Sequence, residues 1–161
     1  MIADVTIRLA VPVDAQSIAL LSRDLIEYGL HWGWHTERVA KAIAAPDMNV
    51  AVAGPEGSPF AFGIMEYHDE HAHLVLFAVK PERQRQGVGS VLLHWLETVA
   101  RTAGAQRIQV EARQANLEAR SFYNEHGYHE RAIDRAMYSS RVDGVLLEKW
   151  LRVRQAPPSD A

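Results

Sequence analysis

Apolar side chains are concentrated in one short segment near the middle of the chain. Every residue of the segment 74–79 is apolar, and most of these residues favour β-structure. A run of this kind is typical of a β-strand that is covered on both faces. Pro81 follows closely, and a proline has no backbone N–H with which to pair to a neighbouring strand. The pattern therefore predicts a buried strand that ends just before Pro81.

A different periodicity begins at Val88. Apolar residues recur there with the spacing of one helical face, at Val88, Val91, Leu92, Trp95, Leu96 and Val99. Gly87 and Gly89 lie where this helix is expected to start. Because glycine has no Cβ, backbone N–H groups can approach a bound group closely there, and the helix N-terminus adds partial positive charge. The strand, turn and helix of residues 72–100 therefore predict an anion site, most naturally for phosphate.

Two known phosphate loops do not fit this turn. A P-loop requires Lys followed by Ser or Thr after its second glycine, and Ser90-Val91 does not supply that pair. A dinucleotide-binding loop requires a third glycine, which is missing here. The glycines alone thus indicate a phosphate site without identifying its ligand.

The rest of the chain alternates between helical and strand patterns. A first helix is marked by Asp14 and ends near Gly29, and a second runs from Thr36 to just before Pro46. Strands are expected at residues 5–9, 50–53, 60–67 and 108–112, and an antiparallel pair at residues 128–138 and 142–151. This order predicts an α/β fold in which helices cover both faces of a mixed sheet.

The composition is that of one globular domain, which we expect to span residues 1–154, with a disordered tail at residues 155–161. Of the 161 residues, 48% are hydrophobic and 23% are charged, which are ordinary values. The net charge of −3 argues against a nucleic-acid partner. We find neither a membrane-spanning apolar run nor a signal-peptide pattern, so no membrane partner and a cytoplasmic location are expected. The absence of cysteine excludes a cysteine nucleophile.

Two signatures resemble those of one enzyme superfamily. Residues 84–89, which follow a strand ending in Val79, read Gln-Arg-Gln-Gly-Val-Gly and resemble the acyl-coenzyme-A loop of the GNAT acetyltransferases. Residues 116–128 fit the second GNAT signature, Asn-x-x-Ala-x-x-Phe-Tyr-x-x-x-Gly-Tyr, at the right distance after the first. Gln84 replaces the commoner Arg, and Tyr128 replaces the commoner Phe. With both signatures in order, the chain is identified as a GNAT member that resembles the ribosomal-protein N-terminal acetyltransferases.

The resemblance implies a GNAT fold from about Val5 to Trp150, with a central mixed seven-stranded sheet flanked by about four helices. It also implies an N-acetyltransferase that uses acetyl-CoA to modify a primary amine, either a small-molecule amine or a protein or peptide N-terminus. Direct transfer in a ternary complex is expected, because no cysteine can carry the acetyl group. The alternative is a non-catalytic acyl-CoA-binding regulatory module. A homodimer is left open.

By the same resemblance, the coenzyme is held at the end of the buried strand, at the turn with the two glycines, and on the second signature. The residues assigned to coenzyme binding are Phe77, Ala78, Val79, Gln84, Arg85, Gln86, Gly87, Val88, Gly89, Ser90, Asn116 and Tyr123. Tyr123 is also the expected general acid, because many members keep a tyrosine near the thioester sulfur and a phenol can protonate a thiolate of comparable pKa. The alternative for Tyr123 is packing on the inner face of its helix.

Two residues compete for the role of general base, which removes a proton from the amine. His73 lies six positions before Val79, where other members carry an acidic residue or a histidine, and imidazole titrates near neutrality. Glu111 lies five positions before Asn116, in a run that resembles Glu-x-Arg-x-x-Asn of the ribosomal-protein N-terminal acetyltransferases. The larger number of matches around Glu111 favours it. The alternatives are a solvent-facing His73, and a surface Glu111 or a Glu111 paired with Arg113.

Two further clusters have both a structural and a functional interpretation. Trp32 and Trp34 lie between the first two predicted helices, where they either cap the core or, as the resemblance suggests, bind the acceptor substrate. The second cluster contains His68, Asp69, Glu70, His71 and His73. Its spacing allows two imidazoles on one strand face, but a polar β-turn is favoured over a metal site, and no metal is expected.

Overall fold

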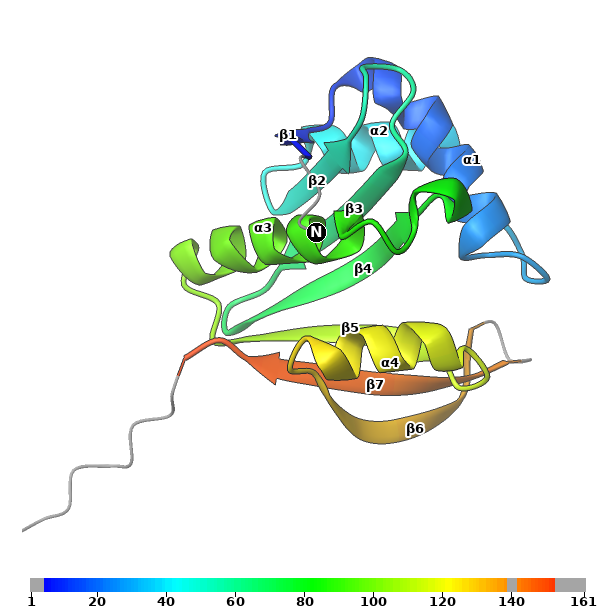
Figure 1. Ribbon diagram of the computed structural model, residues 1–161. Coiled ribbons are helices and arrows are strands. Elements are labelled where there is room, and N and C mark those ends of the chain that lie inside the picture. Colours follow the sequence, from blue (N-terminus) through cyan, green and yellow to red (C-terminus); the bar gives the residue numbers. More distant parts are fainter. Residues whose placement is uncertain (1–4, 139–141, 153–161) are drawn as a thin grey trace, which may run out of the picture.

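The computed structural model describes the backbone of residues 5–138 and 142–152, together with the side chains of these ranges outside residues 133–142 (Figure 1). The strands are β1 (Ile7–Leu9), β2 (Met48–Ala53), β3 (Ala61–Tyr67), β4 (His71–Val79), β5 (Arg107–Arg113), β6 (His129–Tyr138) and β7 (Val142–Trp150). The helices are α1 (Ala15–Leu25), α2 (Thr36–Ala44), α3 (Val88–Thr102) and α4 (Leu117–Glu125). Short 3-10 turns at Pro12–Asp14 and Pro81–Arg83 precede α1 and follow β4.

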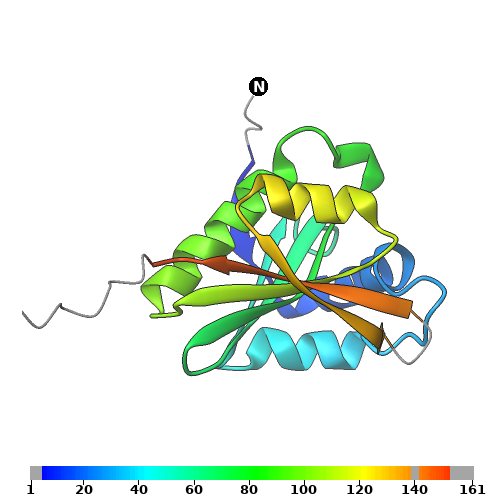
Figure 2. The same ribbon diagram turned by 90° about the horizontal axis from the view of Figure 1, so that it is seen from below.

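The strands form one mixed sheet in the order β1-β2-β3-β4-β5-β7-β6. Neighbouring strands are antiparallel, except that β4 and β5 are parallel. Figure 2 shows α3 and α4 on one side of the sheet and α1 and α2 on the other. The predicted fold class, a mixed seven-stranded sheet between helices, is therefore confirmed.

The parallel ladder between β4 and β5 is short. It runs from the pair His71 and Arg107 to the pair Leu74 and Val110. Beyond this point β4 keeps β3 as its partner and β5 keeps β7, so the two strands separate (Figure 1). The sheet is thus divided into one part with β1 to β4 and another with β5, β7 and β6. Glu111 is the first residue of β5 after the separation.

A β-bulge at Val75 changes which face of the sheet the side chains of β4 occupy. Ile64 of β3 lies opposite Leu76, but the next residue, Met65, lies opposite Leu74, so Val75 is an additional residue. Leu74 therefore packs in the core on the α3 and α4 side, and Leu76 packs on the α1 and α2 side. In a regular strand these two side chains would face the same way.

Each face of the sheet carries its own apolar core. The core beneath α3 and α4 includes Leu92, Leu93, Leu96, Ile108 and Tyr128, and the core beneath α1 and α2 includes Ile18, Val39, Phe62 and Ile64. All of these side chains are buried. Full burial of one such side chain stabilises the fold by about 1.5–3 kcal/mol. The helical face predicted from Val88 onward is the face that α3 buries against the sheet.

The end of α1 differs from the prediction. The sequence pattern predicts an end near Gly29, but α1 stops at Leu25 and Gly29 lies in the following turn with φ of 74°. The Glu27 carboxylate is the physical reason. It accepts hydrogen bonds from the Ser22 hydroxyl at 2.7 Å and from the backbone N–H groups of residues 33 and 34 at 2.8 and 3.3 Å. These contacts fold the chain back onto α1.

The antiparallel pair predicted at the end of the domain is observed as β6 and β7. The predicted disordered tail, residues 155–161, lies outside the described residues. Within the part of the chain that the structure describes, no helix combines the length and apolar character needed to cross a bilayer.

Candidate active site

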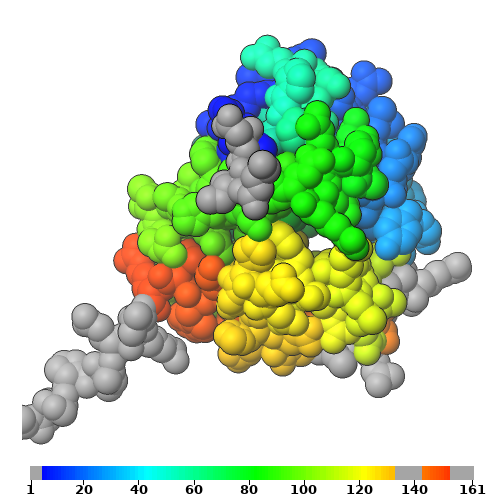
Figure 3. Space-filling view, viewed as in Figure 1, coloured from blue at the N-terminus to red at the C-terminus, as the bar shows by residue number. Residues whose placement is uncertain are grey.

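A cleft of about 560 Å³ lies beside the C-terminal half of β4, between the turn of residues 84–90 and α4. Figure 3 shows the opening, bordered by this turn, by the segment after α1 and by the start of α4. The predicted coenzyme-binding residues that line the cleft are Phe77, Ala78, Val79, Gln84, Arg85, Gly87, Gly89, Ser90, Asn116 and Tyr123. Gln86 and Val88 do not line it: Gln86 is exposed beside it, and Val88 is buried in the core.

The turn holds the first residues of α3 against this cleft. The Gln84 amide donates to the Val79 carbonyl at 2.9 Å, which ties the turn to the end of β4. Arg85 and Gly87 both have positive φ, 62° and 81°. Gly87 is the N-cap of α3 and provides no side-chain cap. The first N–H groups of a helix have no partner within the helix, so this end of α3 offers amide donors and partial positive charge to an anion.

The bulge in β4 determines what faces α4. Because the side chains change faces at Val75, Phe77 and Val79 pack on the α4 side. The centroid of the Tyr123 ring lies 6.3 Å from that of the Phe77 ring and 5.5 Å from that of the Tyr128 ring. Tyr123 is 5% exposed and still lines the cleft. Tyr123 is therefore packed among aromatic rings and also lines the cleft, and its role as general acid stays a prediction.

Two polar groups of α4 complete this wall. The Asn116 side chain caps α4 by accepting a hydrogen bond from the Ala119 N–H at 3.1 Å. His126, which sequence reasoning missed, lies 2.8 Å from the Ser90 hydroxyl through Nε2 and 2.7 Å from the Phe122 carbonyl through Nδ1. A carbonyl only accepts, so Nδ1 carries the hydrogen and Nε2 accepts from Ser90 when the ring is neutral. The contact joins the first turn of α3 to the last turn of α4.

The candidate base Glu111 lies where the sheet divides. Its neighbours Val110 and Ala112 are buried on the α3 and α4 side, so Glu111 projects from the opposite face, on which α1 and α2 lie. Glu111 is half-buried. It follows the last residue of β5 that pairs with β4. Glu111 does not itself line the cleft. Its position at the separation of β4 and β5 nevertheless places it on the strand that borders the gap between the two parts of the sheet.

The other candidate base, His73, lies within the paired part of β4. It is opposite Glu66 of β3 and Gln109 of β5. Burial lowers the pKa of His73, and although Glu66 acts in the opposite direction, His68 and His71 lower it further. The imidazole is therefore neutral at neutral pH, which suits a base. His73 does not line the cleft, and the strands on both sides enclose it.

The histidine cluster has the features of a polar strand end. His68 and His71 stack with ring centroids 4.7 Å apart, and His68 lies 2.7 Å from Glu66. Burial lowers the pKa of His71, with His68 and Arg107 adding to the effect. Among the described residues, no group of three or more His, Cys, Asp or Glu side chains is arranged to hold a metal ion.

The two tryptophans between α1 and α2 do not line the cleft. Trp34 is buried in the core beneath α1 and α2, and the Arg38 guanidinium lies 3.9 Å from its ring. The centroid of the Trp32 ring lies 4.0 Å from that of the His35 ring and 5.6 Å from the Arg23 guanidinium carbon. Trp34 therefore contributes to the core, while Trp32 lies at its edge.

Comparison with known proteins agrees with this architecture. An alanine N-acetyltransferase that acts on ribosomal protein bS18, from Escherichia coli (strain K12), is 32% identical over 94 residues. The match covers 56% of this chain and 64% of that protein, so the chain spans somewhat less than two thirds of this curated relative.

Two solved structures share the fold. The crystal structure of the ribosomal-protein-S18-alanine N-acetyltransferase from Escherichia coli superposes with a TM-score of 0.79 at 23% identity, covering 96% of this chain and 97% of that one. The PaiA N-acetyltransferase from Thermoplasma acidophilum, solved in complex with coenzyme A, superposes with a TM-score of 0.77 at 17% identity, covering 91% and 99%. The sequence model of the acetyltransferase (GNAT) family matches residues 18–128, from α1 to the end of the second signature. Since this match includes more than half of the chain, the protein belongs to the acetyltransferase (GNAT) family.

Proposed function

We propose that this protein is an acetyl-CoA-dependent N-acetyltransferase that transfers the acetyl group directly to a primary amine in a ternary complex. The observation that carries the proposal is the separation of β4 and β5 immediately before Glu111, beside a cleft lined by the glycine turn and Tyr123. The coenzyme A bound to a protein of the same fold supports the choice of ligand.

In this proposal the coenzyme's phosphates lie at the start of α3. The amide donors of the turn and the partial charge of the helix N-terminus suit a pyrophosphate. Among the residues that the structure describes, no strand pairs with the edge of β4 beyond Leu74 on the β5 side, and buried backbone N–H and C=O groups require partners. The amide groups of the pantetheine arm can pair with this edge, and a β4 N–H can stabilise the oxyanion that forms on the thioester carbonyl.

The chemical step then involves two side chains. The amine nitrogen attacks the thioester carbonyl carbon, and Glu111 accepts a proton from the nitrogen. When the C–S bond breaks, the Tyr123 hydroxyl donates its proton to the departing sulfur. Both proton transfers are general acid–base catalysis, each worth about 10²–10⁴-fold. No cysteine is available to form an acyl-enzyme, which favours direct attack.

A protein or peptide N-terminus is the acceptor that we favour over a small amine. The bS18-alanine specificity in the name of a 32% identical relative supports this class. The chemistry also favours it, because an α-amino group with pKa of about 7.7–8.0 is far more often neutral at pH 7 than a lysine-like amine with pKa of about 10.4. A larger fraction of the acceptor is then already unprotonated and able to attack.

The test is release of free coenzyme A from acetyl-CoA in the presence of N-terminal peptides and of small amines. Because the protein contains no cysteine, a thiol reagent reports coenzyme A alone, without a signal from the enzyme. We expect release that depends on the acceptor, with the acetylated peptide identified by mass spectrometry. Tight acetyl-CoA binding without release for any acceptor would instead identify a non-catalytic acyl-CoA-binding module.

A further inference from the structure

Arg113, the last residue of β5, contacts a segment that is distant in the sequence. Its Nη2 donates to the carbonyl oxygens of Ile26 and Tyr28, each at 2.6 Å. The guanidinium carbon also lies 4.0 Å from the centre of the Tyr28 ring. Hydrogen bonds from a charged donor are stronger than neutral ones, and a planar guanidinium can bond and stack at once. Arg113 therefore attaches the residues after α1 to the end of β5.

The attached segment is itself internally ordered. Residues 26–34 return onto α1 because the Glu27 carboxylate accepts from the Ser22 hydroxyl and from the N–H groups of Gly33 and Trp34. Trp34 is buried in the core. A contact at Ile26 and Tyr28 thus fixes the position of the whole segment, and not of one flexible side chain.

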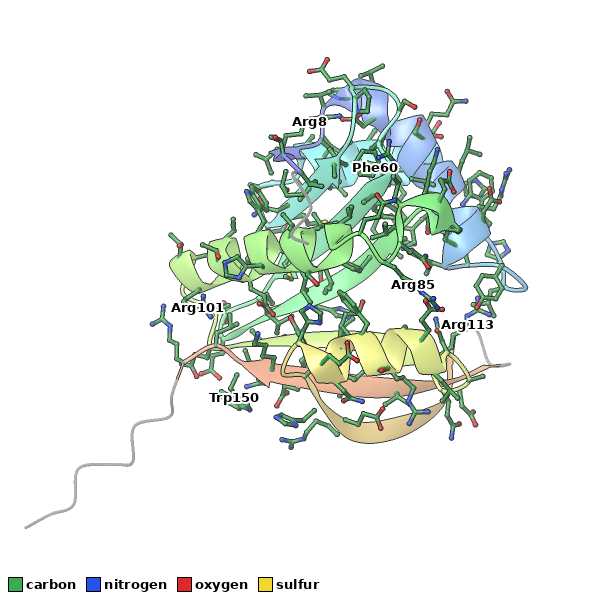
Figure 4. The ribbon with its side chains drawn as sticks, viewed as in Figure 1. Arg8, Phe60, Arg85, Arg101, Arg113 and Trp150 are labelled. Carbon is green, nitrogen blue, oxygen red and sulfur yellow. The ribbon has the colours of Figure 1, made fainter. Side chains whose placement is uncertain are left out.

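The segment begins directly after a residue of the cleft wall, on the face of the sheet from which Glu111 projects. Leu25, the last residue of α1, lines the cleft. Arg113 lies two positions after Glu111 on the same strand, so both side chains project from the face of the sheet on which α1 lies. Figure 4 shows Arg113 at the open end of the separation between the two parts of the sheet. One guanidinium therefore connects the strand of the candidate base to the wall beside the opening.

We propose that Arg113 is a positioning residue that holds residues 26–34 at the opening so that this segment binds the acceptor and directs its amine to Glu111. This inference rests on the proposed acetyltransferase function. Arg113 itself is not a catalytic residue here, because it acts through the segment that it fixes. The coenzyme site lies at the turn and α4, so loss of Arg113 affects the acceptor and leaves the coenzyme in place.

The test compares Arg113→Met with Arg107→Met. Arg107 is a matched control at the other end of β5: its guanidinium lies 5.3 Å from the Trp150 ring and its Nε lies 3.2 Å from Glu148. We expect Arg113→Met to raise the KM for the acceptor at least tenfold, with kcat at saturating acceptor and calorimetric coenzyme A affinity within about twofold of wild type. Arg107→Met should leave the acceptor KM unchanged. An unchanged KM in Arg113→Met, or an equal rise in the control, overturns the proposal.

A second measurement does not depend on activity. Hydrogen exchange should accelerate at the Gly33 and Trp34 amides in Arg113→Met but not in Arg107→Met, because the segment loses its attachment to β5. Arg113→Lys serves as a second variant if Arg113→Met folds poorly, since one ammonium cannot reproduce the planar double contact. Unaltered exchange overturns the attachment itself. A wild-type enzyme that acetylates no acceptor, while exchange still accelerates in the variant, would refute the proposed function and the acceptor role but keep the attachment.

Discussion

Gly89 and Phe122 pack so closely that a side chain on Gly89 would disturb α4. A Cβ built on Gly89 would lie 3.2 Å from Cε1 and 3.3 Å from Cζ of the Phe122 ring. The missing side chain therefore allows the close contact between α3 and α4, in addition to the access that we propose it gives to the coenzyme. Because Tyr123 is the next residue along α4, the position of the turn and the position of the candidate acid are linked. A substitution at Gly89 would change both, so Gly87 is the better position at which to test phosphate binding.

Gly87→Val should weaken coenzyme A binding by at least tenfold, about 1.4 kcal/mol. Gly87 has φ of 81°, and a β-branched residue there is strained as well as bulky beside the phosphate site. Gly104→Val is the matched control, because Gly104 has φ of 96° just beyond the other end of α3 and its Cβ would meet nothing within 4 Å. Isothermal calorimetry on the folded variants measures the affinity. Equal affinity in the two variants would contradict the assignment of the phosphate site.

Tyr123→Phe should lower kcat by about 10²-fold with little change in coenzyme A affinity. The substitution keeps the ring packed near Phe77 and Tyr128 and removes only the hydroxyl that we propose protonates the thiolate. Tyr67→Phe is the control, because the Tyr67 hydroxyl accepts from the Asn49 amide at 2.8 Å on the other part of the sheet. Steady-state turnover and calorimetry give the two quantities. Near-normal turnover would make Tyr123 a packing residue.

Glu111→Gln should remove most of the activity, by about 10²–10⁴-fold, whereas His73→Gln should retain it. Glu111 lies at the separation of β4 and β5, and His73 lies within the paired ladder. The pH–rate profile provides an independent check. Burial lowers the pKa of His73 below the ordinary imidazole value of about 6.5. If His73 were the base, the acid limb of the pH–rate profile would therefore lie below that value. This limb would disappear in His73→Gln. Substantial activity in both variants would defeat both assignments and indicate a base acting through water.

Asp14→Asn should lower the free energy of unfolding at neutral pH. In the variant, this free energy should also decrease less than in wild type when the pH is lowered. Burial alone would raise the pKa of Asp14. The Arg8 guanidinium at 2.8 Å and the N–H groups of Val11 and Gly57 together lower it by more than burial raises it, so the net pKa lies below its usual range. The carboxylate therefore contributes stability above its unfolded pKa, and this contribution is lost as the pH falls through the folded value.

We expect a loss of about 1–3 kcal/mol for Asp14→Asn at pH 7, since a buried charged hydrogen-bond partner is removed. Urea unfolding at pH 7 and at about pH 2, well below the ordinary Asp value of about 3.9, measures it, and the difference between the two pH values should be smaller in the variant than in wild type. Asp24→Asn is the control, because the Asp24 and Arg23 pair is exposed and should contribute little. A variant with the pH dependence of wild type would show that other groups control acid unfolding.

The parts of the fold that the sequence predicts are those determined by local patterns. The apolar run at residues 74–79 and the helical spacing from Val88 specify β4 and α3 without knowledge of their neighbours. The two signatures identify the turn and α4, which line the cleft. Phe77, Gly87 and Tyr123 could therefore be assigned to one site before their distances were known.

Features that depend on contacts between distant residues were not predictable. The bulge at Val75 is invisible in the sequence, because an uninterrupted apolar run contains no alternation from which a change of face can be read. The end of α1 depends on Glu27 reaching residues 33 and 34, and the role of Arg113 depends on two carbonyl groups more than eighty positions away. His126 has no signature of its own, and only the approach of α3 to α4 brings it to Ser90.

The short ladder between β4 and β5 has a thermodynamic consequence. A protein whose sheet lacks hydrogen-bond partners along an inner edge can obtain them from a bound molecule, which then takes the place of a strand. Any ligand that binds the folded chain alone raises the free energy of unfolding, by about 2.7 kcal/mol at a concentration one hundred times its Kd. The coenzyme would thus be a structural component as well as a reactant, and the melting temperature of the protein would follow the cellular concentration of the coenzyme.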